Sequence, residues 1–247
     1  MPQDNPAARL KVILENGFKA PKDKQCIVTW GELLHVKEND TKEIFTRLSK
    51  VMELPAKITY QLQMHFPQYV ETSDLWRAPI EAAFINQQLG AKWDSFINHI
   101  NPHCIAHLGL IGEILHSKFL LNLPPEDEIS KLISELNTIL TDVENSSLPI
   151  NIKLYLTQEL MELIKMMREY KIIGLEPIIK QTESIIGHSH RDNSFYTFLK
   201  DHEIGQRVLD NLSAISSILT IYLSIPQLPQ VVESTSQLVQ STFLLLK

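Results

Sequence analysis

The sequence predicts an all-α protein, a multi-helix bundle of about eleven or twelve helices, and three observations support this prediction. Apolar residues recur at steps of three and four along most of the chain, and no segment alternates convincingly with period two. Glycine is scarce, with 8 residues among 247, against a usual share of roughly 7%. Glycine and proline also stand where helices should end and begin, at Gly17, Gly90, Gly174 and Gly187 for the ends and at Pro6, Pro55, Pro125 and Pro177 for the starts.

Capping residues predict four helices before residue 67. Asn5 and Asp40 are suitable N-caps, the first followed by proline and the second by Glu43 at capping-box spacing. Thr29 and Glu32 share that spacing and predict the start of a short helix. The expected helices cover residues 7–16, 29–36, 41–53 and 55–66.

Three further helices are expected before residue 122. Ser73 and Asp74 cap the first of them, and Gly90 closes it. A short helix follows over 91–100, and Asn101–Pro102 begins another that reaches about residue 121.

The longest periodic segments predict an antiparallel helical hairpin, 126–145 and 149–173, on which the bundle is built. Pro125 precedes three acidic residues that suit the positive end of a helix dipole. The connection Asn145–Pro149 is so short that the two helices must be antiparallel neighbours. Each helix carries one apolar stripe, formed by Ile129, Leu132, Ile133, Leu136, Ile139, Leu140 and Val143 and by Ile152, Leu156, Leu160, Leu163, Met167 and Tyr170.

The rest of the chain predicts four more helices around one polar loop, 188–193. Their expected ranges are 177–187, 194–200, 203–225 and 230–246. For the domains, the loop Pro67–Ser73 predicts a boundary between a small N-terminal subdomain, 1–70, and a larger bundle, 71–247. A single continuous domain is the alternative.

Charge and cysteine content predict a cytoplasmic protein that does not grip nucleic acid with its whole surface. The net charge is −6, whereas a non-specific nucleic-acid binder would carry a basic surplus. Cys26 and Cys104 are too few for a disulfide framework and suit a reducing compartment. The polar first residues have no apolar stretch of the kind found in signal peptides.

Histidines spaced four residues apart suggest a metal site at His103 and His107. Side chains at i and i+4 share one helix face and can bind a transition metal, with His99 and Cys104 nearby. Pro102 separates His99 from the other two, and core-type residues surround the pair. Ordinary helix histidines are therefore the alternative.

The loop 188–193 concentrates polar residues and is the first candidate for an exposed recognition site, formed by His188, His190, Arg191 and Asp192. The pattern His-x-His-x-Asp occurs in hydrolases of the metallo-β-lactamase type, where another histidine follows directly. Asn193 stands at that position here, and the flanking segments are helical. Metal-dependent hydrolysis at this loop or at His103 and His107 stays a third hypothesis, and the chain shows no phosphate loop or nucleophile elbow.

Residues 30–51 have the pattern of a helix-turn-helix, which predicts possible DNA contact through Lys42, Arg47 and Lys50. A recognition helix places such side chains against phosphates and base edges. Within residues 18–57, eight Lys and Arg face six Asp and Glu, so the basic surplus is small. Short helices with solvated basic faces are the alternative.

The segment 211–232 contains no charged residue and allows two interpretations. Its apolar part, Leu212–Ile225, is shorter than the roughly 20 residues that a membrane-spanning helix needs. Ile215, Ile218, Leu219 and Tyr222 share one helix face, which is either core or a surface for a membrane or a partner. Pro226 and Pro229 could form the turn of an inserting hairpin.

Three short segments resemble a group of uncharacterised bacterial helical proteins found in accessory genomic regions. The segments are Asn5–Leu10, Lys50–Pro55 and Ile186–His188, and they consist of caps and core positions. The resemblance implies a helical fold and a setting such as phage defence or a toxin–antitoxin pair. It implies no catalytic residue.

The sequence as a whole predicts a non-enzymatic cytoplasmic protein that acts through protein–protein contacts as a regulatory or adaptor component. No cofactor is expected. We expect a protein partner, or a homo-oligomer that forms through the hairpin or the C-terminal helices. The alternatives are a membrane-acting effector that uses 211–232 and a DNA-contacting protein. The partner, the trigger, the oligomeric state and the burial of 211–247 stay open.

Overall fold

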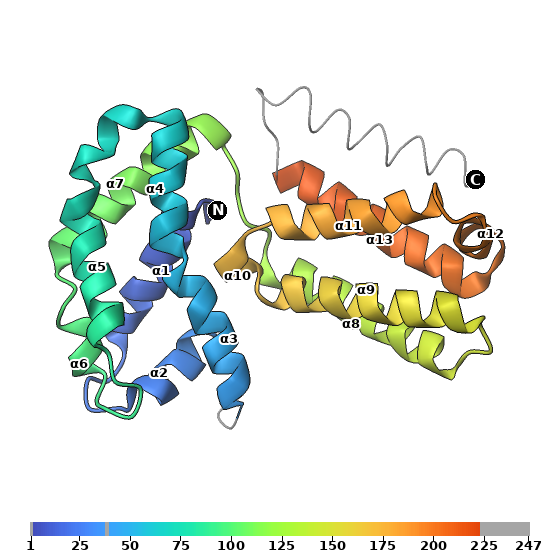
Figure 1. Ribbon diagram of the computed structural model, residues 1–247, viewed down its shortest axis with the longest axis horizontal. Coiled ribbons are helices and arrows are strands. Elements are labelled where there is room, and N and C mark those ends of the chain that lie inside the picture. The colour runs from blue at the N-terminus through green and yellow to red at the C-terminus, as the bar shows by residue number, and fades with distance from the viewer. Residues whose placement is uncertain (1, 38–39, 223–247) are drawn as a thin grey trace. The chain divides into compact units, whose positions relative to one another are not determined.

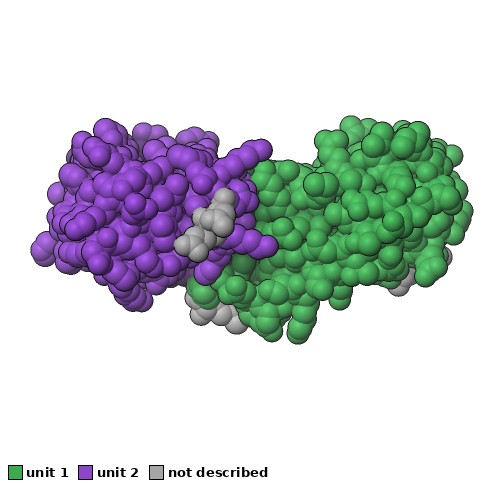
Figure 2. All heavy atoms as spheres, turned by 90° about the horizontal axis from the view of Figure 1, so that it is seen from below, with its two compact units in different colours: residues 1–2, 120–247 green, residues 3–119 purple. Residues whose placement is uncertain are grey.

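The computed structural model describes residues 2–37 and 40–222, which fold into helices α1 to α13 and two short 3₁₀ turns. Within those residues no β-strand forms, and Gln25 and Lys92 make an isolated bridge. The predicted all-α helical bundle is therefore confirmed (Figure 1). The chain divides into two compact units, unit 1 with residues 1–2 and 120–247 and unit 2 with residues 3–119 (Figure 2).

Unit 2 contains the first seven α-helices. α1 packs along α7 and α4, and α5 also packs along α7. The first helix of unit 2 is therefore in contact with the last helix of the same unit. The helices are α1 (Pro6–Lys19), α2 (Cys26–Leu33), α3 (Thr41–Met52), α4 (Leu54–His65), α5 (Asp74–Asn86), α6 (Asp94–Ile97) and α7 (Pro102–Phe119), and the 3₁₀ turns are Pro67–Tyr69 and Glu71–Ser73.

Aromatic rings fill the centre of unit 2. Trp30 is fully buried and contacts the rings of Phe84, Trp93 and Phe96, with centroid distances of 6.1, 5.1 and 5.0 Å. The two indole N–H groups find acceptors, since Trp30 Nε1 donates to Gln87 Oε1 and Trp93 Nε1 donates to the Gly17 carbonyl. A buried indole needs such a partner to offset its desolvation.

Unit 1 is built on the predicted hairpin, which the structure confirms, although the second helix ends at Arg168 and the short helix α10 (Tyr170–Ile173) covers the end of the predicted range 149–173. The connection between α8 and α9 is four residues long. Helices α8, α9, α11 and α13 form one bundle (Figure 1), and their packing encloses one aliphatic core. The apolar stripes that the sequence predicts supply that core, with Leu136, Leu156 and Leu160 fully buried. The helices are α8 (Glu126–Asn145), α9 (Ile150–Arg168), α10 (Tyr170–Ile173), α11 (Glu176–Ser189), α12 (Asn193–Asp201) and α13 (Glu203–Tyr222).

Two predicted N-caps are confirmed by their hydrogen bonds. The Asn5 side chain accepts from the Ala8 amide at 2.9 Å, and Asp40 accepts from the Glu43 amide at 3.0 Å. Each side chain satisfies a backbone donor that the helix leaves unpaired. The capping box at Thr29 is wrong, because α2 begins three residues earlier and the Thr29 hydroxyl donates to the Gln25 carbonyl.

Two of the predicted helix ends are also wrong. α1 continues past Gly17 to Lys19, and α11 continues past Gly187 to Ser189. Gly17 serves a packing contact instead, since a Cβ there would lie 3.0 Å from Trp93 Cζ2. Gly174, by contrast, ends α10 with a φ of 83°, the left-handed conformation that favours glycine.

Two other helices are shorter than the sequence predicts. The helix expected over 91–100 is reduced to α6, and α5 ends at Asn86, before Gly90. The helix expected over 230–246 and the last three residues of 203–225 lie outside the described residues.

The boundary between the two units follows Phe119, whereas the sequence placed a boundary in the loop Pro67–Ser73. The helices on both sides of that loop, α4 and α5, belong to unit 2. The cause is the packing of α1 on α4 and α7, which ties the two ends of unit 2 together. Contacts between such distant segments leave no local signal in composition.

Candidate functional site

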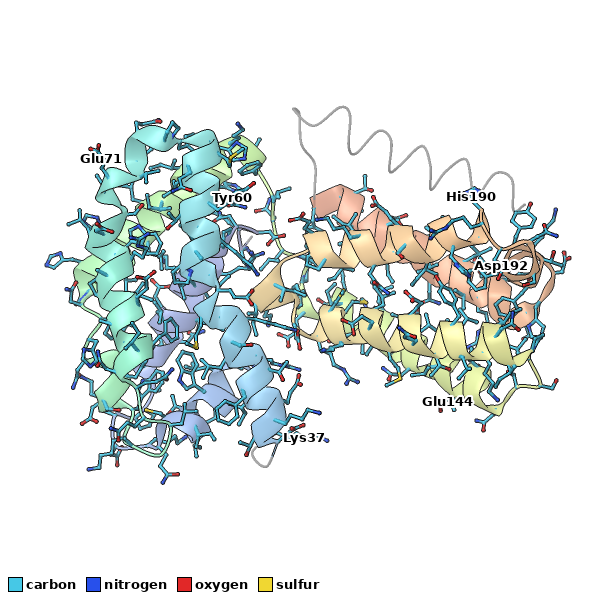
Figure 3. The ribbon with its side chains drawn as sticks, in the orientation of Figure 1. Lys37, Tyr60, Glu71, Glu144, His190 and Asp192 are labelled. Atoms are coloured by element: carbon cyan, nitrogen blue, oxygen red, sulfur yellow. The ribbon has the colours of Figure 1, made fainter. Side chains whose placement is uncertain are left out.

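The candidate recognition residues lie at the corner between α11 and α12. His188 is in the last turn of α11, His190 follows the helix, and Asp192 is the N-cap of α12 (Figure 3). The predicted loop is therefore shorter than expected, since α11 includes its first two residues. His190 and Arg191 are exposed, and His188 and Asp192 are half-buried.

This corner forms one wall of a surface pocket of about 230 Å³, which we call the α9–α12 pocket. Helices α9, α11 and α12 contribute to it, so it belongs to unit 1 alone. Its lining residues are Asn151, Ile152 and Tyr155 of α9, His188 of α11, and Asp192 and Phe195 at the start of α12.

Three rings in the pocket are packed on one another. The Tyr155 and His188 rings stack with centroids 4.0 Å apart and planes 24° apart. The Phe195 ring contacts both of them edge-on, with each centroid 5.1 Å away. Burial raises the pKa of the Tyr155 phenol, and the nearby charge of Glu159 raises it further, so this ring stays uncharged at neutral pH.

Asp192 holds the start of α12 through one of its two carboxylate oxygens. Its Oδ1 atom accepts from the Ser194 hydroxyl at 2.6 Å and from the amides of Ser194 and Phe195 at 2.9 and 3.2 Å. The hydroxyl of Ser194, followed by the Phe195 amide, holds the pKa of Asp192 below its usual range. The second oxygen, Oδ2, lies 3.8 Å from His188 Nε2, a distance longer than a hydrogen bond.

The order of these three groups does not match a catalytic triad. In a triad the histidine stands between the serine and the carboxylate and takes the serine proton. Here Asp192 stands between Ser194 and His188, so the serine hydroxyl donates to the carboxylate. The arrangement suits binding better than nucleophilic chemistry.

Next to the pocket, α9 presents apolar side chains to solvent. Ile150, Leu154 and Met161 have 68%, 64% and 55% of their surface exposed. They stand at i, i+4 and i+11, spacings that place all three on one face of a helix. We call this set the α9 outer face.

The other candidate metal residues, His103 and His107, lie in the first two turns of α7. His103 is exposed and His107 is half-buried. Within the described part of the chain, no three His, Cys, Asp or Glu side chains lie together as a metal site would require. The hypothesis of a metal at these residues therefore gains no geometric support.

The candidate DNA contacts do not act as one set, because Arg47 is buried. Its Nε donates to Glu43 Oε1 at 2.8 Å and its Nη1 donates to the Leu34 carbonyl at 2.8 Å. Its guanidinium therefore joins α3 to the end of α2 and is unavailable to a phosphate. Lys42 is exposed and Lys50 is half-buried, while the exposed part of α3 also carries Phe45.

The C-terminal surface predicted as one alternative is core. Ile215, Leu219 and Tyr222 are 1%, 4% and 8% exposed, and Ile218 is partly buried against the same cluster. The helix α13 packs on α8, which covers this face. Among residues 2–37 and 40–222, no helix combines the length and the apolarity that crossing a bilayer requires. Residues 223–232 of the charge-free segment lie outside the described residues.

No protein family, curated protein or solved structure matches the chain. The resemblance to helical bacterial proteins therefore stays a prediction.

Sequence reasoning missed Tyr155 and Phe195 as pocket residues and did not single out the α9 outer face. A signal for that face exists in the sequence. Ile150, Leu154 and Met161 are large apolar residues that fall outside the core stripe of α9, and such residues must be exposed if the stripe is buried.

Proposed function

We propose that the protein is a non-enzymatic cytoplasmic component, regulatory or adaptor in role, that acts by binding another protein through the α9 outer face. The observation that supports this proposal is the exposure of Ile150, Leu154 and Met161 on one side of α9. Scattered apolar residues are normal on a protein surface, whereas several aligned on one face mark an interaction site. A role in phage defence depends on the resemblance alone.

Charge indicates the kind of partner. Helix α8, which packs beside α9, contains six acidic residues and one basic residue, Lys131. An amphipathic helix of the partner, with an apolar face and basic flanks, would match both the outer face of α9 and the acidic neighbour.

A photo-activated cross-linking residue at Gln158, which lies between Leu154 and Met161 on α9, tests the proposal in cells. The cross-linked protein is identified and purified, and its affinity for the full chain is measured. We expect Leu154→Ala and Met161→Ala each to weaken binding about tenfold, because truncated anchors at an interface core cost more than 1 kcal/mol.

The matched control is Ile85→Ala on α5 of unit 2. Ile85 is 80% exposed, so its truncation removes a comparable apolar side chain away from α9. Unchanged affinity in both α9 variants contradicts the proposal. Cross-linking of the chain to a second copy of itself contradicts the choice of partner and favours homo-oligomerisation.

A further inference from the structure

The α9–α12 pocket has the size of a single side chain. Pockets that bind drug-sized molecules usually measure about 300–1,000 Å³, and this one measures about 230 Å³. It lies on the same helix as the α9 outer face, since Asn151 and Tyr155 directly follow Ile150 and Leu154 in sequence. A protein bound to the α9 outer face would therefore pass beside the pocket.

The lining combines aromatic rings with one carboxylate. Tyr155 and His188 are half-buried and supply accessible ring surface, while Phe195 and Ile152, only 1% and 6% exposed, contribute small apolar patches. A planar cation is attracted to the faces of aromatic rings, and a guanidinium also stacks on them. The rings therefore favour a ligand that has both an apolar stem and a flat positive head.

Asp192 supplies the negative charge that such a head requires. Its Oδ1 atom is engaged by three donors at the start of α12, so the carboxylate is fixed in place. Its Oδ2 atom has His188 Nε2 at 3.8 Å and can accept a hydrogen bond from an incoming N–H group.

The overall charge of unit 1 adds to this attraction. Near Tyr155 itself, Glu159 raises the phenol pKa and Arg191 lowers it, so charges of both signs lie close to the ring. On a wider scale, unit 1 contains 16 Asp and Glu against 10 Lys and Arg. A basic group approaching the pocket therefore meets an excess of negative charge.

We propose that the α9–α12 pocket binds an arginine side chain of the protein that contacts the α9 outer face. The methylene stem lies against Ile152 and the rings, and the guanidinium donates to Asp192 Oδ2. This inference rests on the proposed function for the origin of the arginine, but the pocket itself can be tested without a partner.

The test uses Nα-acetyl-L-arginine amide as the probe and the full chain as the protein. NMR signals of the His188 and Phe195 rings are followed as the probe is added. We expect saturable shifts with a dissociation constant on the order of 1–10 mM, typical of one carboxylate contact and one cation–π contact. The corresponding citrulline derivative, which has the same shape without the charge, should cause no saturable shift.

Two variants separate the pocket from general charge effects. Asp192→Asn should weaken binding about fivefold, and asparagine is as good an N-cap as aspartate, so α12 is retained. Asp201→Asn is the control, because Asp201 is exposed at the other end of the same helix and does not line the pocket. Tyr155→Leu should also weaken binding, since it removes one ring face.

Each alternative outcome has a clear meaning. Equal shifts with arginine and citrulline, or equal affinity in Asp192→Asn and Asp201→Asn, overturn the proposal. Equal affinity for Nα-acetyl-L-lysine amide overturns the choice of arginine. If the arginine probe binds while Leu154→Ala leaves partner affinity unchanged, the pocket stands and the proposed α9 surface fails; the reverse pair of results removes the pocket alone.

Discussion

Unit 2 and unit 1 are stabilised by different kinds of core. All three tryptophans of the chain lie in unit 2, where Trp30 and Trp93 combine ring contacts with hydrogen bonds. Unit 1 contains no tryptophan, and its core is mainly Leu, Ile and Val from the periodic stripes of its helices. An aromatic core depends on a few large contacts, whereas an aliphatic core distributes its stability over many small ones.

The units also differ in charge. Unit 2 contains 13 Lys and Arg and 13 Asp and Glu, so it is neutral. Unit 1 contains 10 and 16, so it accounts for the whole net charge of −6. The surface that we propose for a basic partner therefore belongs to the unit whose charge would attract one.

The largest loss of stability is expected from a substitution at Trp30, in the aromatic core of unit 2. Trp30→Ala should lower the free energy of unfolding by about 4 kcal/mol, because large-to-small changes at buried tryptophans lose both burial and packing. Its ring contacts Phe84, Trp93 and Phe96, so the cavity would lie at the centre of unit 2. Urea unfolding followed by the fluorescence of Trp76 and Trp93 measures it, and a loss below about 1 kcal/mol contradicts the importance of the ring cluster.

The second-largest effect on stability is expected at a close contact between helices α12 and α13 of unit 1. A Cβ at Gly205 would lie 2.2 Å from the Phe198 carbonyl oxygen, and neither backbone can move freely because α12 and α13 are packed together. Gly205→Ala should therefore destabilise the protein by about 3 kcal/mol, as overpacked sites do. Urea unfolding followed by circular dichroism measures the change.

Gly187→Ala is the control for Gly205→Ala. Gly187 lies inside α11, and a Cβ there would meet no atom within 4 Å. Alanine at an unobstructed helical position should stabilise the protein by about 0.5–1 kcal/mol. Changes of the same sign in both variants would show that helix propensity, and not the contact between α12 and α13, decides the outcome.

The parts of the fold that the sequence predicts correctly are those specified by nearby residues. The hairpin is predicted because each stripe repeats over several turns, and the caps Asn5 and Asp40 act within three residues of themselves. The predictions that helices end at Gly17 and Gly187 are wrong, because a glycine inside a helix has the same local sequence signature as a glycine at the end of a helix. Gly17 is instead explained by Trp93, a residue far away in sequence.

The candidate site shows the same limit. Its polar residues, His188 to Asp192, are adjacent in sequence and could be singled out there. Tyr155, which stacks on His188, comes from α9, and only the packing of α11 on α9 brings the rings together. Arg47 is predicted to contact DNA because it is charged, but the residue is buried. Its guanidinium donates to the Leu34 carbonyl, a contact that the local sequence does not indicate.

Two tryptophans of unit 2 allow the hydrogen bond to be separated from the ring. Trp93 Nε1 donates to the Gly17 carbonyl at 2.8 Å, while Trp76 Nε1 has no hydrogen-bond partner among the described residues, and both side chains are fully buried. Trp93→Phe should cost about 1.5 kcal/mol more than Trp76→Phe, because only the first change removes a buried hydrogen bond. Chemical unfolding of both variants measures the difference, and equal losses would mean that the indole bond contributes nothing net.

The smallest expected effect concerns alkaline stability and Tyr170 of unit 1. Burial, followed by the charges of Glu126 and Asp127, raises the pKa of Tyr170 from 10.0 to about 12, and its hydroxyl donates to the Pro124 carbonyl at 3.3 Å. Between these two pH values the folded state binds the phenol proton more tightly than the unfolded state does. Stability should therefore be complete below pH 10 and fall as the pH rises toward 12.

Because pH 11 lies halfway between the unfolded pKa of 10.0 and the folded pKa of about 12, the loss at that pH is about 1 kcal/mol. Urea unfolding at about pH 9 and about pH 11 measures it, with Tyr170→Phe as the comparison, since phenylalanine keeps the ring and has no proton to lose. The variant should be less stable than the parent at the lower pH, because the bond to Pro124 is gone, and should lose less stability between the two pH values. Burial also raises the pKa of Tyr222 in the same unit, so Tyr222 adds to the loss of stability at high pH. The contribution of Tyr170 is therefore the difference between parent and variant in how steeply the free energy of unfolding falls with pH. Parallel slopes in parent and variant would show that the alkaline sensitivity of unit 1 does not arise at Tyr170.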